Sequence, residues 1–549
     1  MLPAVVPKSN NLVGAITRFY LRWRRPTAST QPSPAAIAPP AAAGTAPPRL
    51  DAGRSCPAQP AAGVPAFVAE CPVARRYLAL LGPLDWAHFP ERPTHRPWPG
   101  SPPAPRAPYV AAFLVKLNEG LRSMGKLRRY LVEHPALVWL LGFPLVADPA
   151  APHGFDVERS VPLRRQFGRV LRELDNAALQ FLLDGAVKLI HQALPEDLQA
   201  GFGDVISLDT KHILAWVKQN NPKAYVDERF DKTKQPKGDP DCKLGCKRRH
   251  NRGEGDGERA GEACSAPQTP ASAACPAPVA TPTSDARPAS QTVSVGEYYW
   301  GYASGVVTTK VVGWGEIVLA ELTQTFDHGD ATYFHPLMAQ TERRLGRRPR
   351  YGALDKAYDA FYVYQWFHDA GGFAAVPLVA KGRSDVRSFS PEGLPLCAAG
   401  LAMPLKFSFV DRTTTLVVHE RGKYVCPRLF PSKSAEACPI DHENWPKGGC
   451  SAMMPTCIGA RLRYQLDRDS DQYKRVYKQR TADERANSQA VDLGIERPRL
   501  RRQSAIANQN TLIYVLINLR ALQRIGARQA ELAQQASPAG QEVTATLAA

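Results

Sequence analysis

Two short apolar runs that each end in aspartate constrain the fold of this chain most. Residues 205–209 (VISLD) and 351–355 (YGALD) have the length and composition of buried β-strands. Further strand patterns cover 298–312, 317–325 and 373–379, and helical patterns cover 360–370 and 511–525. Strands that alternate with helices predict an α/β fold in which ligands bind at strand ends. We expect Asp209 and Asp355 each to terminate a strand, where a carboxylate is solvated or binds a cation.

A third acid, Glu484, lies in a dense basic and polar segment, residues 477–488 (YKQRTADERANS). We expect a helix over 473–493, on which Tyr477 and Arg480 share a face with Glu484. An alternative for Arg480 is an exposed ion pair with Glu484, worth only a few tenths of a kcal/mol. Three carboxylates from distant segments suit two Mg²⁺ or Mn²⁺ ions, because hard cations prefer oxygen ligands and two ions can clamp a phosphodiester.

Other acids near these three are weaker candidates for metal ligands. Asp204 precedes Asp209 by five residues and lies on the opposite face of the expected strand. Asp359 belongs to the helix that follows Asp355, and Asp483 points about 100° away from Glu484 around a helix.

The charge of the chain favours a polyanionic partner. The 549 residues include 69 Lys and Arg against 51 Asp and Glu, a net charge of +18. Nucleic-acid affinity depends largely on phosphate neutralisation, so this excess of positive charge suits DNA or RNA. An alternative is a basic protein from a high-GC genome, in which arginine is common and the net charge is equally positive. Basic runs at 343–350 and 497–502 flank the expected acidic site and are candidate DNA tracks.

Cysteine usage and hydropathy argue against a secreted, disulfide-rich protein and against a membrane-spanning protein. The 11 cysteines are an odd number without the spacing of a secreted disulfide framework. The most apolar run, 136–144, is too short to cross a bilayer, which needs about 20 residues. We therefore expect a cytoplasmic protein without a membrane partner.

Several other patterns are weaker indications. The helices expected over 161–174 and 177–194 fit a helix-turn-helix or an ordinary helical hairpin. Two clusters are minor candidates for zinc: Cys242, Cys246 and His250 with Cys264 or Cys275, and Cys438, His442, Cys450 and Cys457. Four tryptophans are candidates for stacking on a base, although most tryptophans are core residues: Trp300, Trp314, Trp366 and Trp445.

The acids and their neighbours resemble a known family. Tyr477, Arg480 and Glu484 match a Tyr-x2-Arg-x3-Glu-x6-Lys signature of bacterial insertion-sequence transposases of the DDE class. Val491 stands at the position of the signature lysine, and the resemblance covers roughly residues 155–527. It implies an RNase H-like α/β fold with a mixed sheet flanked by helices. It also implies two Mg²⁺ or Mn²⁺ ions on Asp209, Asp355 and Glu484, which would catalyse cutting and joining of DNA ends.

The resemblance also implies the partners. They are double-stranded DNA, as terminal inverted repeats and as target, and a second copy of the chain on that DNA in the bacterial nucleoid. Tyr477, Arg480, Arg485 and Lys356 are the expected DNA contacts. Two alternatives stay open: an inactive relative that only binds DNA, which Val491 favours, and a metal-dependent nuclease that does not join strands.

The expected domain organisation has six parts. They are a disordered segment and Pro/Ala linker over 1–66, a helical DNA-binding region over 67–200, the first part of the catalytic core over 201–384 with a disordered insertion at 251–292, a β-rich insertion over 385–470, the final part of the core over 471–527, and a disordered tail over 528–549.

Overall fold

The computed structural model describes residues 64–91, 104–247, 297–379, 387–412, 416–440 and 444–536. The insertion predicted at 251–292 and nearly all of the segment 1–66 lie outside the described residues. Within the described part, no helix is long and apolar enough to span a membrane.

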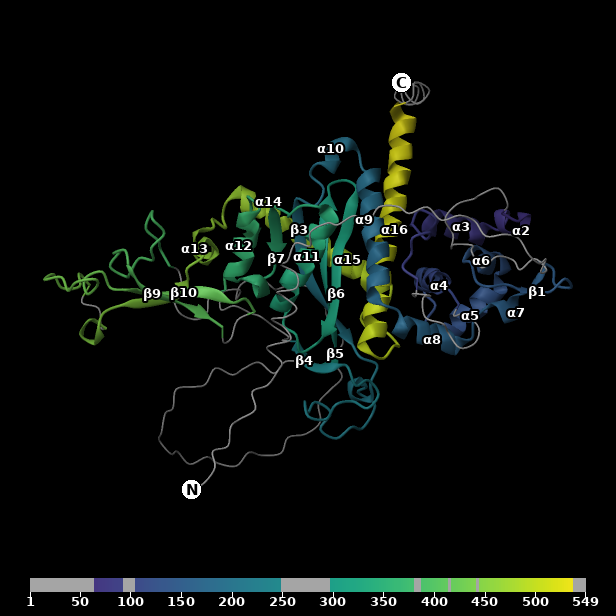
Figure 1. Ribbon diagram of the computed structural model, residues 1–549, viewed down its shortest axis with the longest axis horizontal. Coiled ribbons are helices and arrows are strands. Elements are labelled where there is room, and N and C mark those ends of the chain that lie inside the picture. The colour runs from purple at the N-terminus through teal and green to yellow at the C-terminus, as the bar shows by residue number, and fades with distance from the viewer. Residues whose placement is uncertain are drawn as a thin grey trace, which may run out of the picture. The chain divides into compact units, whose positions relative to one another are not determined.

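A mixed six-stranded sheet forms the centre of the α/β fold (Figure 1). Its order is β4-β5-β3-β7-β8, and β6 also pairs with β5. Strand β3 is antiparallel to β5 and parallel to β7, which is parallel to β8. The strands are β3 (Val205–Leu214), β4 (Lys243–Lys247), β5 (Glu297–Val311), β6 (Gly315–Thr325), β7 (Tyr351–Leu354) and β8 (Phe373–Ala375). The α/β class and the alternation of strands and helices are therefore confirmed.

The prediction that Asp209 terminates its strand is wrong. Strand β3 continues to Leu214, because its antiparallel neighbour β5 supplies partners as far as the pair Leu214 and Gly301. Asp209 therefore lies in the middle of β3, beside the end of the much shorter β7. Asp355 does follow the last residue of its strand, Leu354.

Helices cover both faces of the sheet, so neighbouring residues of β5 belong to different cores. Val306 packs in the cluster that contains Ala486 of α15 (Thr481–Asp492) and Leu512 of α16 (Gln503–Ala536). Val307 packs in the cluster that contains Leu337 of α11 (Phe334–Leu345) and residues of α12 (Phe361–Asp369). The side chains of a strand alternate between faces, and this alternation decides which groups meet α15.

The N-terminal region is helical. Its helices α4 (Ala107–Asn118) and α5 (Met124–Glu133) are separated by a turn at Gly120, which has a φ of 61°. The other elements are α2 (Ala66–Ala69), α3 (Pro72–Leu81), α6 (Pro135–Leu140), β1 (Val146–Ala147), β2 (Phe155–Asp156), α7 (Val157–Ser160) and α10 (Glu196–Gln199).

Helices α8 (Arg164–Glu173) and α9 (Asn176–Ala193) follow one another directly, joined at Leu174 and Asp175. The Asp175 side chain caps α9 by accepting a hydrogen bond from the Ala177 N–H at 3.1 Å. Helix α9 packs on α16, β6 and α11. A recognition helix needs a free face for the major groove, and this packing covers much of α9. Helix α8 packs on α5 and α16, so the two helices do not pack along one another as a hairpin.

The segment before the last predicted acid carries a separate antiparallel sheet, in the order β11-β10-β9. Its strands are β9 (Leu405–Asp411), β10 (His419–Val425) and β11 (Ser451–Pro455). Helix α13 (Ile458–Gln465) follows and packs on α12.

The C-terminal helices differ from the prediction at two places. The helix expected over 473–493 is divided into α14 (Asp471–Tyr477) and α15 by a 3-10 turn, η5 (Lys478–Arg480). Helix α16 extends to Ala536, so residues 528–536 are helical and do not belong to a disordered tail. The apolar stripe that predicted this helix ends at Ile525, but the sequence ARQAELAQQA continues with strong helix formers. Short 3-10 turns also occur at η1 (Lys218–Asn220), η2 (Asp330–Tyr333), η3 (Lys356–Tyr358) and η4 (Trp445–Lys447).

A buried acid joins the sheet to the helices. Glu321 of β6 is 1% exposed and accepts hydrogen bonds from Gln180 Nε2 at 2.9 Å and from the Thr511 hydroxyl. Its Oε2 atom has no hydrogen-bond partner among the described residues. Burial raises the pKa of Glu321 to about 7, although Thr511 and the nearby Arg344 lower it.

We expect the Glu321→Gln variant to lose part of the pH dependence of stability. An unfolded glutamate has a pKa of about 4.3, so up to about pH 7 the folded protein keeps a proton that the unfolded chain has lost. The free energy of unfolding therefore falls as pH rises through this window, by at most about 4 kcal/mol. Urea unfolding of both proteins at several pH values measures the difference, and parallel curves would contradict the buried, protonated acid.

Candidate active site

The parallel pairing of β3 and β7 brings the first two predicted acids together. Leu208 and Leu354 are the last paired residues of the two strands, and Asp209 and Asp355 follow them directly. Paired strands lie about 4.8 Å apart, so these carboxylates are neighbours. Asp355 leaves the sheet as the cap of η3, where its Oδ1 accepts a hydrogen bond from the Ala357 N–H at 2.5 Å.

Asp209 belongs to the face of the sheet that packs against α15. Its Oδ2 accepts a hydrogen bond from Asn487 Nδ2 at 3.1 Å. Burial raises the pKa of Asp209, and the carboxylates of Asp355 and Asp330 raise it further, while the Thr210 N–H and Arg480 lower it. The site therefore concentrates negative charge in a poorly solvated place, which is the condition that a bound cation relieves.

The structure adds a carboxylate that sequence reasoning missed. Asp330, at the start of η2, accepts a hydrogen bond from Thr210 Oγ1 at 2.8 Å. Thr210 directly follows Asp209, so Asp330 lies at the rim of the same acidic site. Its segment, HGDAT, resembles an ordinary polar turn, and only the tertiary structure brings it to β3.

Glu484 and Asp483 occupy different environments on α15. Glu484 is 53% exposed, and its Oε1 accepts a hydrogen bond from Arg480 Nη2 at 2.6 Å, the ion pair that the sequence left as an alternative. Asp483 is fully buried and accepts a hydrogen bond from Thr308 Oγ1 at 2.7 Å. Burial raises the pKa of Asp483 well above its ordinary value, and Asp209 adds to the effect.

The face expected to join Tyr477, Arg480 and Glu484 is interrupted. Arg480 contacts Glu484 as an i,i+4 pair, but the 3-10 turn η5 separates Tyr477 from the turns of α15 that carry Glu484. The Tyr477 ring instead stacks on Tyr473, with ring centroids 5.7 Å apart. Arg480 reaches Glu484 on one side and lowers the pKa of Asp209 on the other.

Three buried polar atoms around Asp209 have no hydrogen-bond partner among the described residues. They are Asp483 Oδ2, Asn487 Oδ1 and the Tyr358 hydroxyl. Burial raises the pKa of Tyr358, and so do Asp330, Asp209, Asp483 and Asp355, which places this hydroxyl among the acids. Each such atom costs about 1–3 kcal/mol, and a ligand that hydrogen-bonds or coordinates there removes the cost.

The remaining two competing acids are engaged elsewhere. Asp204 forms ion pairs with Arg347 and Arg350. Asp359 accepts two hydrogen bonds from Arg463, at 2.6 and 2.8 Å. Their partners hold both carboxylates in the framework that surrounds the site.

The expected DNA contacts lie at the surface to different degrees. Lys356 is exposed beside Asp355, whereas Arg485 is 61% exposed and pairs with Glu316 at 2.6 Å. Val491, at the position of the signature lysine, packs partly buried against the core.

The two basic runs differ in how their arginines are used. In the run 343–350, ion pairs with Asp184 and Asp204 engage several arginines. In the run 497–502, four arginines are exposed, namely Arg497, Arg499, Arg501 and Arg502, and Arg502 pairs with Asp241 at 3.4 Å. The second run therefore offers more free charge to a phosphate backbone.

The tryptophan predictions require a correction. Trp300 is 1% exposed, and its Nε1 donates to the Arg229 carbonyl at 2.7 Å, so it cannot stack on a base. Trp314, Trp366 and Trp445 are only partly exposed. Trp216, which follows β3, is 52% exposed, and the guanidinium of Arg501 lies 5.0 Å from its ring centroid.

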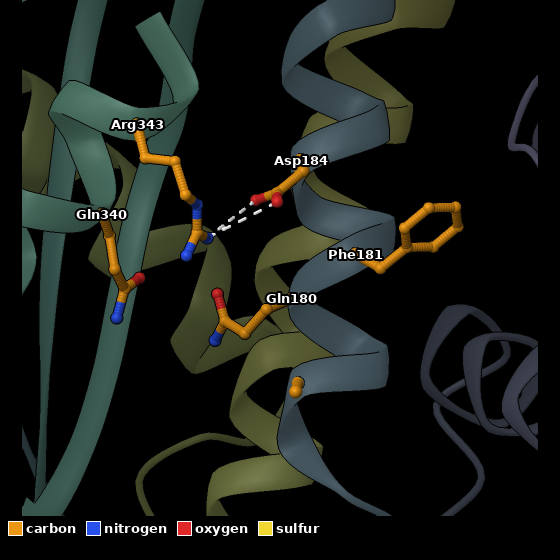
Figure 2. Close-up of a pocket in the computed structure, with 6 residues that line it drawn as sticks. Gln180, Phe181, Asp184, Gln340 and Arg343 are labelled. Atoms are coloured by element: carbon orange, nitrogen blue, oxygen red, sulfur yellow. Dashed lines mark hydrogen bonds and ion pairs between the residues drawn. The ribbon is translucent and has the colours of Figure 1, made fainter. Parts of the chain in front are cut away.

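A shallow cavity between α9 and α11 contains none of the predicted acids (Figure 2). Figure 2 shows Arg343 directed at Asp184, at 3.4 to 3.5 Å, while Phe181 points away from them. Arg344, next in sequence, also binds Asp184 and is almost completely buried. These contacts stabilise the junction of two helices and involve none of the residues of the acidic site.

No formed metal site is found within the described ranges. In them, no three His, Cys, Asp or Glu side chains stand together as a set of metal ligands. Asp209 and Asp355 form a pair, while Arg480 engages Glu484. For the first zinc cluster, Cys242 is buried, Cys246 is exposed, and His250, Cys264 and Cys275 lie outside the described residues.

Comparison with known proteins gives no match: no protein-family model, curated protein or solved structure is similar to this chain.

Proposed function

We propose that this protein is a DNA transposase that cleaves phosphodiester bonds at the ends of an insertion sequence and joins the 3′-hydroxyl ends to target DNA. The observation that carries the proposal is the pairing of Leu208 with Leu354, which makes Asp209 and Asp355 neighbours. Unpartnered buried oxygens beside Asp209 and a net charge of +18 support it. The strand order β6-β5-β3-β7-β8, with antiparallel strands followed by parallel ones, supports an RNase H-like core.

The residues present fit hard divalent cations. Asp209 and Asp355 directly follow the last paired residues of β3 and β7, and burial raises the pKa of Asp209, with a smaller contribution from the charge of Asp355. The unpartnered Asn487 Oδ1 adds an oxygen acceptor. Asp209, Asp355 and Glu484 would hold two Mg²⁺ or Mn²⁺ ions, which when bound activate a water or a 3′-hydroxyl and stabilise the leaving oxygen.

The other residues orient this chemistry. Asn487 holds the Asp209 carboxylate through its amide at 3.1 Å, and the Ala357 N–H holds Asp355 at 2.5 Å. Arg480 binds Glu484, and a DNA phosphate that takes over Arg480 would release the third carboxylate toward the other two. Lys356, Arg485 and Tyr477 would contact the DNA near the cleaved end, and two copies would act on paired ends in the bacterial cytoplasm.

The test is cleavage of labelled DNA that carries the inverted repeats flanking the gene, with Mg²⁺ or Mn²⁺ and with both ends present. We expect nicking at the repeat boundary and then strand joining, both lost in EDTA. Val491, which packs against the core, favours the second candidate, a DNA-binding relative without catalysis. Binding of the repeats without cleavage in either metal would support that candidate, and cleavage without joining would indicate a nuclease.

Variants of two adjacent residues of α15 would show which of them is the third metal ligand. We expect Glu484→Gln to lower cleavage by more than about 100-fold, because it removes a metal ligand, and Asp483→Asn to lower it by about 10–100-fold, as loss of a supporting partner does. Single-turnover cleavage measures both variants. A larger loss in Asp483→Asn than in Glu484→Gln would make Asp483, which lies closer to the sheet, the third ligand.

A further inference from the structure

Cysteines gather at one end of the three-stranded sheet, outside the acidic site. Cys426 directly follows β10, and Cys450 directly precedes β11. The antiparallel pairing of the two strands ends with Val425 opposite Ser451, so the same register places Cys426 opposite Cys450. Facing residues of paired strands have Cβ atoms about 4.5–5.5 Å apart.

A glycine allows this close approach. Gly449 has a φ of 77°, and a Cβ atom added to it would lie 2.8 Å from the Cys426 Cβ and 3.5 Å from the Cys426 Sγ. The backbone next to Cys450 therefore packs directly on Cys426. A side chain at 449 would push the two cysteines apart.

A third thiol comes from a separate turn. Cys397 lies in a tight turn, in which its N–H donates to the Leu401 carbonyl at 2.9 Å and its carbonyl accepts from Gly400 at 2.9 Å. The turn leads to Pro404, whose carbonyl accepts a hydrogen bond from the N–H of Val425 at 3.1 Å. Cys397 and Cys450 pack against the same small core. Burial raises the pKa of the Cys450 thiol to about 12, and the nearby thiols of Cys426 and Cys397 contribute to this rise.

We propose that Cys397, Cys426 and Cys450 are ligands of one structural zinc ion, with Cys438 as the fourth ligand. Zinc favours four thiolates in a tetrahedral site, and a structural site of this kind fixes loops that have little core. The buried core of this region consists of four residues, Met403, Tyr424, Met454 and Ala460. Strand β9 leaves large apolar side chains exposed, so packing contributes little to holding the loops.

The set of ligands differs from the cluster expected from sequence. Cys457 lies beyond the other end of β11 and caps α13, whereas Cys450 precedes β11. Six residues of extended chain between Cys450 and Cys457 separate them by roughly 20 Å, too far to share one ion. Cys438 lies in the loop that connects Cys426 to Cys450, and its thiol is free and partly exposed. His442 lies outside the described residues.

On binding, four thiols and one Zn²⁺ form a tetrathiolate complex and release four protons. No oxidation state changes. In the described residues the three thiols lie near one another but do not stand as a formed set of ligands. Zinc would bring the Cys438 thiol to the other three. Binding is therefore coupled to proton release.

The test is the zinc content of the full-length protein, purified without chelator and measured by elemental analysis. We expect about one zinc per chain in the wild type and a loss to near zero in Cys426→Ser and Cys450→Ser. Two matched controls, Cys457→Ser and Cys246→Ser, should keep the metal, because Cys457 lies beyond β11 and Cys246 is an exposed residue of β4.

A second measurement makes the result independent of folding of the variants. Wild-type protein loaded with Co²⁺ should show the charge-transfer absorption of cobalt thiolates, and Zn²⁺ should protect these thiols from alkylation. Equal, substoichiometric zinc in all proteins together with rapid alkylation would overturn the proposal. A disulfide between Cys426 and Cys450, detected by mass spectrometry, would overturn it as well.

Discussion

Replacement of Asp355 by asparagine is expected to abolish metal-dependent cleavage of element-end DNA, with a loss of at least about 10³-fold. Asp355 is the neighbour of Asp209 across the end of the β3–β7 pairing, and both carboxylates are required to hold cations there. An amide retains the shape of the side chain but removes the negative charge. Single-turnover cleavage in Mg²⁺ and in Mn²⁺ measures the effect.

The same variant should fold normally and bind DNA at least as well as the wild type. Asparagine can still cap η3 by accepting from the Ala357 N–H, since Asn and Asp are about equally good caps. Loss of one charge also relieves the repulsion that contributes to the raised pKa of Asp209. Asp492→Asn, at the exposed end of α15, is a matched control that should cleave normally. Normal cleavage by Asp355→Asn would exclude the proposed metal site.

Replacement of Asp359 by alanine, only four residues later, should produce the opposite pattern: a loss of stability of about 3–5 kcal/mol. The Asp359 side chain is 1% exposed and accepts hydrogen bonds from Arg463 at 2.6 and 2.8 Å and from the Val379 N–H at 2.8 Å. The Tyr364 hydroxyl donates to it at 2.9 Å. Removal of the carboxylate leaves Arg463, which is 15% exposed, without its counter-ion.

Equilibrium unfolding in urea, followed by circular dichroism, measures this loss. The double variant Asp359→Ala with Arg463→Met should recover part of the stability, because an apolar pair avoids the cost of an unpaired buried charge. A loss below about 1 kcal/mol in the single variant would show that the ion pair is solvated and contributes little.

Local sequence was sufficient to predict several strands and helices and the position of Asp355, one of the two aspartates of the site. Strands β5 and β6 and helix α12 agree with the patterns that predicted them, because apolar periodicity reports burial directly. The run 351–355 predicted that Asp355 follows a short buried strand, as it does. The matching run 205–209 did not reveal that β3 continues to Leu214, since the pairing of β3 with β5 depends on a strand roughly 100 residues away.

The sequence by itself determined an α/β chain with an aspartate at the end of each of two buried runs, because burial imposes its pattern on each segment independently. Only the tertiary structure decided that these two runs are paired strands, that Asp330 and Asn487 join Asp209, that Asp483 is buried, and that Cys397 lies near Cys450. Each of these contacts joins segments whose local patterns are ordinary. Their chemistry arises from strand register and helix packing, which no single segment encodes.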